Sequence, residues 1–393
     1  LANSGNNSSI GTNGAVTIGS STAGTFSYTG GAVSTNTNFT VGGSGGGTIQ
    51  NAGSGLLTLT GTINNAGNLI SIDTNSANIT ANGVISGAGG LTKLGTNTLT
   101  LGNAANTYAG VTTINAGALS FGTLNNSGSN SSIGTNSSIV IGSSSAGSLS
   151  YTGGATSTNR NITIGGSGGG TIQNAGSGLL TLTGTINNGG NLVSLDTNTA
   201  SITASGVISG AGGLTKIGSN TLTLSNAANT YAGTTTINAG TLSIGTLANS
   251  GSNSSIGTGT AITLGSASAG TLQYTGGATT TNKNITIGGN GGGTIQNAGS
   301  GLLTLSGAIN NSGNPLTFNT SGASITASGI ISGAGSLTKS STNSLTLSGA
   351  NTYSGTTSIN AGTLIANNNT ALGTNSASVA NGATLQVNNG ITL

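Results

Sequence analysis

The sequence contains no cysteine, histidine, methionine or tryptophan, and only 2% of its 393 residues are charged. Without histidine, cysteine or an acidic cluster it offers no dedicated metal site, and we expect no cofactor. Five Lys or Arg residues against two Asp residues give a formal charge of +3. Such sparse charge cannot form the dense cationic face that a nucleic-acid backbone requires. The composition therefore excludes most enzymatic chemistry and argues against a nucleic-acid partner.

Long hydrophobic runs are absent as well. No run approaches the roughly 18 apolar residues of a membrane helix, so we expect no membrane insertion by this segment. Low charge with abundant Gly, Ser, Thr and Asn would suit a disordered linker, but 33% of the residues are apolar. They fall in short regular runs such as "LLTLT", which is typical of a folded chain.

The sequence repeats itself with a period of 123 residues. "LANSGNNSSIGT" at 1–12 returns as "LNNSGSNSSIGT" at 124–135 and as "LANSGSNSSIGT" at 247–258. The period predicts superrepeats at 1–123, 124–246 and 247–368, and a truncated start of a fourth at 369–393, within one continuous solenoid.

Within each copy, apolar residues alternate with small polar ones. Leu57 and Leu59 alternate with threonines, as do Leu99 and Leu101. A period of two predicts strands with one buried face, and the intervening Gly, Asn and Ser clusters predict tight turns. Many short strands in a large internal repeat, with no sustained helical pattern, predict an all-β fold, a parallel β-helix (β-solenoid). A globular sandwich is the rival, but its hydrophobic layers should change along the chain, whereas here they recur.

The phrase "GVISGAGGLTKLG", followed by "TLTL", "NTYAG" and "TINAGAL" at 83–119, resembles the autotransporter-associated β-strand repeat of bacterial passenger domains. The resemblance implies a right-handed β-helix stalk, exported through a C-terminal outer-membrane barrel that this stretch does not contain. It also implies a structural role for the recurring motif residues. These are Asn106, Tyr108, Gly110, Asn229, Tyr231, Gly233, Asn351, Tyr353 and Gly355.

Several recurring side chains are candidates for surface contact. Tyr28, Tyr151 and Tyr274 could form a spaced aromatic row for carbohydrate or protein, or they could cover a corner of the coil. The lysines that follow "LT" in each copy are expected to be solvated amines with their stems on the coil surface. These lysines are Lys93, Lys216 and Lys339. Arg160 and Lys283 take the place of Thr37, so that position tolerates a neutral residue.

Two other functions are weighed against a structural one. Asp73 and Asp196 are one superrepeat apart, too far for the about 5 to 9.5 Å that separates paired catalytic carboxylates, so we predict no enzyme. A threonine array could match ice, but Thr58, Thr60 and Thr62 become Thr304, Ser306 and Ala308 in the third copy. The loss of threonine at two of these three equivalent positions argues against ice binding.

The sequence thus favours a non-catalytic structural stalk or fibre on a bacterial outer surface, spacing or displaying an adhesive region. The alternative is an adhesin module that binds a host or matrix glycan or protein with its outer face. Expected partners are further copies of the same repeat, within a longer chain or end to end between chains.

Overall fold

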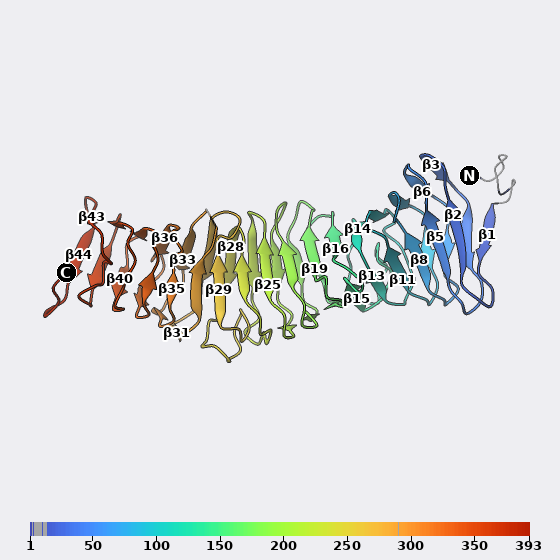
Figure 1. The fold of residues 1–393 in the computed structure, drawn as a ribbon. Coiled ribbons are helices and arrows are strands. Elements are labelled where there is room, and N and C mark those ends of the chain that lie inside the picture. Colours follow the sequence, from blue (N-terminus) through green and yellow to red (C-terminus); the bar gives the residue numbers. More distant parts are fainter. Residues whose placement is uncertain (2, 4–9, 11–13, 290) are drawn as a thin grey trace. The chain divides into compact units, whose positions relative to one another are not determined.

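The computed structural model describes residues 1, 3, 10, 14–289 and 291–393. Within this part every regular element is a β-strand, so no helix is long and apolar enough to cross a membrane. The chain divides into two compact units, Leu1–Ser194 and Leu195–Leu393, and their boundary falls inside the second superrepeat. In each unit the strands wind in coils and pair in parallel with strands of the adjacent coils (Figure 1). The fold is a right-handed parallel β-solenoid, as the sequence and the resemblance predicted.

Unit 1 has three sides, and successive strands of a coil lie on sides 1, 2 and 3 in turn. Side 1 contains β1 (Ala15–Ile18), β4 (Asn38–Val41), β7 (Ile63–Asn64) and β10 (Ile85–Ser86), and it resumes with β17 (Thr156–Thr158) and β20 (Leu180–Leu182). Side 2 contains β2 (Gly24–Tyr28), β5 (Gly47–Asn51), β8 (Ile70–Asp73), β11 (Leu91–Leu94), β13 (Thr112–Ile114), β15 (Ser138–Ile141), β18 (Asn161–Ile164) and β21 (Ile186–Asn187). Side 3 contains β3 (Val33–Thr35), β6 (Leu57–Leu59), β9 (Ile79–Ala81), β12 (Thr98–Leu101), β14 (Gly117–Phe121), β16 (Gly147–Tyr151) and β19 (Gly170–Asn174).

Unit 2 follows the same plan with sides a, b and c, and β22 (Val193–Asp196) crosses the boundary between the units. Side a contains β23 (Ile202–Ala204), β26 (Thr221–Leu224), β28 (Gly240–Ile244), β30 (Gly270–Tyr274), β33 (Gly293–Asn297), β36 (Leu316–Asn319), β39 (Leu337–Ser340), β41 (Thr357–Ile359) and β43 (Ala377–Val379). Side b contains β25 (Leu214–Ile217), β27 (Thr235–Ile237), β29 (Ala261–Leu264), β32 (Asn284–Ile287), β35 (Ile309–Asn310) and β38 (Ile331–Ser332). Side c contains β24 (Ile208–Ser209), β31 (Thr279–Thr281), β34 (Leu303–Leu305), β37 (Ile325–Ala327), β40 (Ser344–Leu347), β42 (Thr363–Ala366) and β44 (Thr384–Val387).

Each superrepeat starts one side further round the coil than the preceding one. In unit 1 the coils from β1–β3 to β10–β12 carry three strands each. Residues 102–111 then cross side 1 without a strand, β13 and β14 follow on sides 2 and 3, and residues 122–137 cross side 1 again. The next copy therefore starts with β15 on side 2, although its equivalent β1 lies on side 1. Unit 2 advances in the same way, because β25 lies on side b and its equivalent β39 on side a.

The predicted strand phase is confirmed. Leu57, Leu59, Leu99 and Leu101 are all fully buried, whereas the threonines between them are partly exposed. Leu99 pairs in register with Ile79 on one side and Leu119 on the other, so aliphatic side chains stack from coil to coil. This stacking buries apolar surface along the whole interior and is the main stabilising term.

Tight corners between the sides require glycine at particular positions. Gly43 has a φ of 73°, and a Cβ atom at this residue would lie 1.2 Å from the carbonyl oxygen of Ser20 in the preceding coil. The left-handed backbone and the close approach of the two coils each exclude a side chain here.

Candidate functional site

The Asn-Thr-Tyr segment continues side 1 of unit 1 without forming a strand. Thr107 N–H donates to Ile85 O at 2.9 Å, so the ladder of β10 is extended. Asn106 is fully buried: its Oδ1 accepts from Ile85 N–H at 2.7 Å, and its Nδ2 donates to Ser132 O at 2.7 Å. Tyr108 is fully buried, with its hydroxyl 2.8 Å from Thr112 Oγ1. We call residues 106–110 the plug, because it fills the coil where a strand is missing.

The same geometry recurs in the other copies of the motif. Asn229 and Asn351 accept from the backbone N–H groups of Ile208 and Ile331, at 2.8 Å in both cases. The tyrosine hydroxyls pair with Thr235 at 2.8 Å and Thr357 at 2.6 Å. The motif glycines lie against a neighbouring coil, where a Cβ would meet backbone atoms at 2.2–2.5 Å, at Gly110, Gly233 and Gly355. All of these contacts are made with the protein's own backbone and side chains.

The tyrosines Tyr28, Tyr151 and Tyr274 cover corners. Each hydroxyl donates to the backbone oxygen three residues later at 2.8 Å. Tyr151 and Tyr274 are only 4% and 3% exposed, and Tyr151 packs on Phe121 with 5.9 Å between ring centroids. Tyr28 lies on side 2 and Tyr151 on side 3. An exposed aromatic row requires exposed rings on one side, so this geometry fits the corner-covering alternative.

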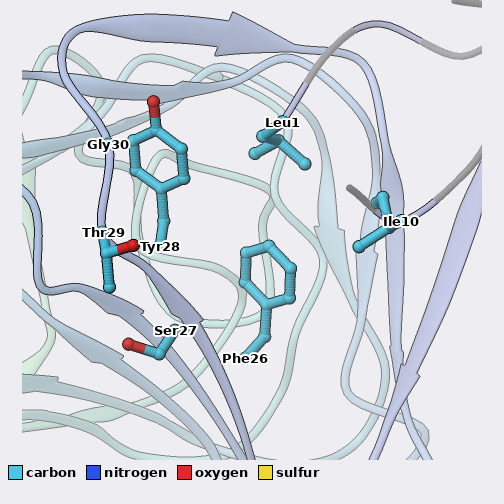
Figure 2. A pocket seen from close by; sticks show the side chains of 7 residues that line it. All are labelled: Leu1, Ile10, Phe26, Ser27, Tyr28, Thr29 and Gly30. Atoms are coloured by element: carbon cyan, nitrogen blue, oxygen red, sulfur yellow. The ribbon is translucent and has the colours of Figure 1, made fainter. Parts of the chain in front are cut away.

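Tyr28 is more accessible than its equivalents and borders a cavity of about 290 Å³. Phe26, Leu1 and Ile10 line the same cavity (Figure 2). At the corresponding place in the second copy, Phe121 of the preceding coil covers Tyr151. The cavity beside Tyr28 therefore corresponds to the position that Phe121 occupies beside Tyr151.

The expectation of solvated lysines is wrong. Lys93, Lys216 and Lys339 are fully buried, and each ammonium group donates to three backbone carbonyl oxygens. For Lys93 these belong to Leu94 at 2.9 Å, to Gly95, and to Ala116 of the next coil at 3.0 Å. An ammonium group has three donors, so one side chain binds three carbonyls at a sharp corner. Leu94 O also accepts from Thr74 N–H at 3.0 Å, whereas the lysine is the donor to Gly95 O and Ala116 O.

A sequence signal could have revealed this burial. Leu91 and Lys93 are two residues apart on one strand, so the side chain of the lysine points inward with that of the leucine. Burial lowers the pKa of each of these lysines to about 8, partly opposed by Asp73 for Lys93 and by Asp196 for Lys216.

The other two cationic side chains, Arg160 and Lys283, are also buried, with 1% and 2% exposure. They lie at the base of equivalent loops, 122–137 before β15 and 245–260 before β29. Burial lowers the pKa of Lys283 and of Arg160. All five cationic side chains of the chain are therefore turned inward, and the outer surface is formed mainly by Thr, Ser, Asn and Gly.

The two carboxylates organise turns. Asp73 accepts hydrogen bonds from Gln50 Nε2 and Asn75 N–H, both at 3.0 Å. Asp196 accepts from Asn198 N–H at 2.9 Å. Both form the Asx-type bond to the residue two positions later, which is a turn role. In the described residues no group of three His, Cys, Asp or Glu could hold a metal ion.

Comparison with known proteins identifies these repeats. A family model of the passenger-associated-transport-repeat matches residues 91–121, 214–244 and 337–366. Each match runs from the strand of the buried lysine through the plug to the end of the next coil. The "Adhesin BmaC autotransporter" of Brucella suis biovar 1 (strain 1330) is 32% identical over 320 residues, which are 74% of this chain. The chain spans only 9% of that relative's length. No solved structure matches this chain significantly.

Proposed function

We propose, from the premise that this chain is built of autotransporter passenger repeats, that it is a non-catalytic stalk or fibre of a bacterial surface protein. Its work is to space or display an adhesive region at the cell's outer surface. The observation that carries the proposal is that the cationic side chains of the repeat and the Asn and Tyr side chains of the plug are buried and bind the protein itself. All five cationic side chains and the plug's Asn and Tyr bind the protein's own backbone or side chains, and they hold coil to coil.

The relative's name supports the adhesive context. A protein described as an adhesin autotransporter is 32% identical to this chain over most of its length, yet the chain corresponds to a small fraction of that protein. A binding role of the outer face is the second candidate, and the exposed loops before β15 and β29 favour it. Carriage at the bacterial outer surface is part of the proposal, because passenger homology implies a cell-surface or extracellular protein.

The partner of a coil in this proposal is another coil of the same repeat within a longer chain. Strand β44, with the sequence Thr-Leu-Gln, corresponds to β30 and thus to β2. Among the described strands, β30 adjoins β28 and β33 of the neighbouring coils, so copies of the repeat stack on one another within this chain. Sedimentation at several concentrations tests this, and concentration-dependent filaments would favour end-to-end assembly instead.

Removal of one superrepeat tests the stalk role. The chain is displayed on a bacterium, anchored at Leu393 and carrying an adhesive tag before Leu1, and residues 124–246 are deleted. The new junction joins Thr123 to Leu247, which begins the same phrase as Leu124, so the coils remain in register. We expect the tag to lie about 25 Å closer to the cell, from roughly five coils of about 4.8 Å, with tag-mediated adhesion retained. Untagged chains that adhere, and lose adhesion after the deletion, would favour the binding role.

A further inference from the structure

The loop between β14 and β15 is a stretch of unit 1 in which the chain leaves the coil. Where each side carries a strand, neighbouring coils are joined by bonds between residues about 20 to 25 apart, such as Thr74 Oγ1 to Leu94 O. Across this loop, Thr158 Oγ1 donates to Asn125 O over 33 residues. Asn125, Asn126 and residues 128–130 are exposed, whereas residues 131–134 at the base are buried. The loop thus presents a polar tip on a packed base.

Arg160 braces this loop from beneath. Its Nε donates to Asn125 O at 2.9 Å, and its Nη2 donates to Gly134 O at 2.7 Å and to Ser129 O at 3.4 Å. Its Nη1 donates to the backbone and side-chain oxygens of Asn136. One guanidinium group therefore holds backbone oxygens at both ends of the tip and at the base.

The equivalent loop before β29 is braced differently. Lys283 donates only to Gly257 at 3.3 Å and to Gly259, both at the base. In the first copy this position is the neutral Thr37, which is also buried. The solenoid therefore does not need a charge here, and burying one is unfavourable unless it is fully hydrogen-bonded. The two loops share their other backbone bonds, so what distinguishes the tip at residues 125–130 is the set of arginine bonds to Asn125 O and Ser129 O.

The charge under the tip is not neutralised within unit 1. The only carboxylate side chain in this unit is Asp73 on β8, and β8 and β18 are four strand spacings apart on side 2, which is about 19 Å. No peptide bond is cis among the described residues. In a trans peptide the N–H of the next residue points opposite to the carbonyl. Since Asn125 O and Ser129 O point toward Arg160, the N–H groups of Asn126 and Asn130 point away from it, toward the tip.

An exposed tip with outward N–H dipoles above a buried positive charge is a favourable place for an anion. We propose that residues 125–130, held by Arg160, are a binding loop for an acidic polysaccharide, whose carboxylate or sulfate oxygens accept hydrogen bonds at the tip. Asn and Ser side chains there add hydrogen bonds to sugar hydroxyls. Arg160 is a positioning residue in this proposal, because it acts through the loop and not by direct contact. The proposal goes beyond the stalk role and does not depend on it.

Binding to defined polysaccharides tests the proposal. The chain is titrated with dextran sulfate, polygalacturonate and uncharged dextran by calorimetry at low and high salt. We expect at least one acidic polymer to bind about tenfold or more tightly than dextran, and the affinity to fall with added salt. The sulfate and carboxylate arms show which anionic group is preferred. Equal binding of dextran, or no binding of either acidic polymer, would overturn the proposal.

Matched variants locate the site. Ser129→Asp places a negative charge on the exposed tip without removing Arg160, and we expect it to weaken binding about tenfold. Ser129→Asn is the neutral control, and Ser252→Asp makes the same change on the loop that Lys283 braces only at its base. Ser252→Asp should weaken binding less than about threefold. Equal losses from the two aspartates would show general charge repulsion and overturn the assignment.

Arg160→Lys separates bracing from charge. It keeps the positive charge but removes the fork that reaches Asn125 and Ser129, so we expect weaker binding together with faster amide exchange at 126–130. Thermal melts of all variants check that the solenoid remains folded. Unchanged affinity and unchanged exchange in Arg160→Lys would contradict the positioning role.

Discussion

Tyr28 and Tyr151 occupy the same place in successive superrepeats, yet they lie on different sides of unit 1. The cause is that residues 102–111 and 122–137 each cross side 1 without forming a strand. With these two crossings, the path from β1 to β15 covers five complete coils and one additional side. A surface feature that occurs once per superrepeat is therefore presented on the next side each time. Rows of like residues form instead between neighbouring coils, as for Thr25 and Thr48.

Disulfide cross-linking tests this path across the loop. Thr113 and Val140 are direct neighbours on β13 and β15, although 27 residues separate them. Adjacent strands place their Cα atoms about 4.8 Å apart, which is within the range that a disulfide spans. The double variant Thr113→Cys with Val140→Cys should oxidise readily, and the absence of natural cysteine makes the product unambiguous.

The control pair is Thr113→Cys with Thr163→Cys. Thr163 lies one strand further on, opposite Val140. At about 9.6 Å its Cα atom is too far for a disulfide without backbone movement. Mass spectrometry after oxidation distinguishes the pairs, and equal cross-linking of both would contradict the register.

The strand phase predicts opposite outcomes for neighbouring substitutions. Leu99→Asp would bury an unpaired carboxylate between Ile79 and Leu119, and we expect it to cost several kcal/mol locally. Thr100→Asp, on the outer face, should cost less than about 0.5 kcal/mol. Urea denaturation measures both. Similar midpoints for the two variants would show that the phase is wrong.

The sequence sufficed for the fold class because a solenoid interior depends on the alternation of single residues. That pattern placed Leu57, Leu59, Leu99 and Leu101 correctly. It failed for Lys93, since hydropathy assigns lysine to the surface, although its phase matches that of Leu91. Nor could it reveal the advance by one side, which depends on how many sides each segment crosses. Thr58 and Thr304 are therefore equivalent in sequence but are not neighbours in a threonine array, since the neighbours of Thr58 are Ser34 and Thr80.

Replacement of a buried lysine tests its role as a corner bond. Lys93→Met keeps the length and the apolar stem but removes the donor to Gly95 O and Ala116 O, whereas Leu94 O keeps its bond from Thr74 N–H. We expect a loss of about 2–4 kcal/mol in local stability, from the desolvation cost of unpaired buried groups. Hydrogen exchange of the amides around residues 94–97 and 115–117 measures the effect. Thr113→Met, on the outer face, is the matched control, and an equal effect of both changes would argue against the corner bond.

The pH dependence of stability follows from buried groups that shift in opposite directions. Burial lowers the pKa of Lys93, Lys216 and Lys339 from 10.5 to about 8. Between pH 8 and 10.5 the unfolded chain therefore binds more protons than the folded one, and stability rises with pH. Burial raises the pKa of Tyr353 from 10.0 to about 12, and it raises the pKa of Tyr108 and Tyr231 as well. Above pH 10 the folded chain retains protons that the unfolded chain loses, so stability falls.

We therefore expect the urea midpoint to rise from pH 7.5 to 9.5 and to fall by pH 11.5. The variant with all three lysines changed to Met should lose the rise, because the titrating amines are gone. Changing Tyr108, Tyr231 and Tyr353 to Phe should reduce the fall, because the titrating phenols are gone while the rings still fill the plug. A midpoint that stays flat between pH 7.5 and 9.5 would mean that the buried ammonium groups keep their protons, and that their bonds to the carbonyls outweigh desolvation.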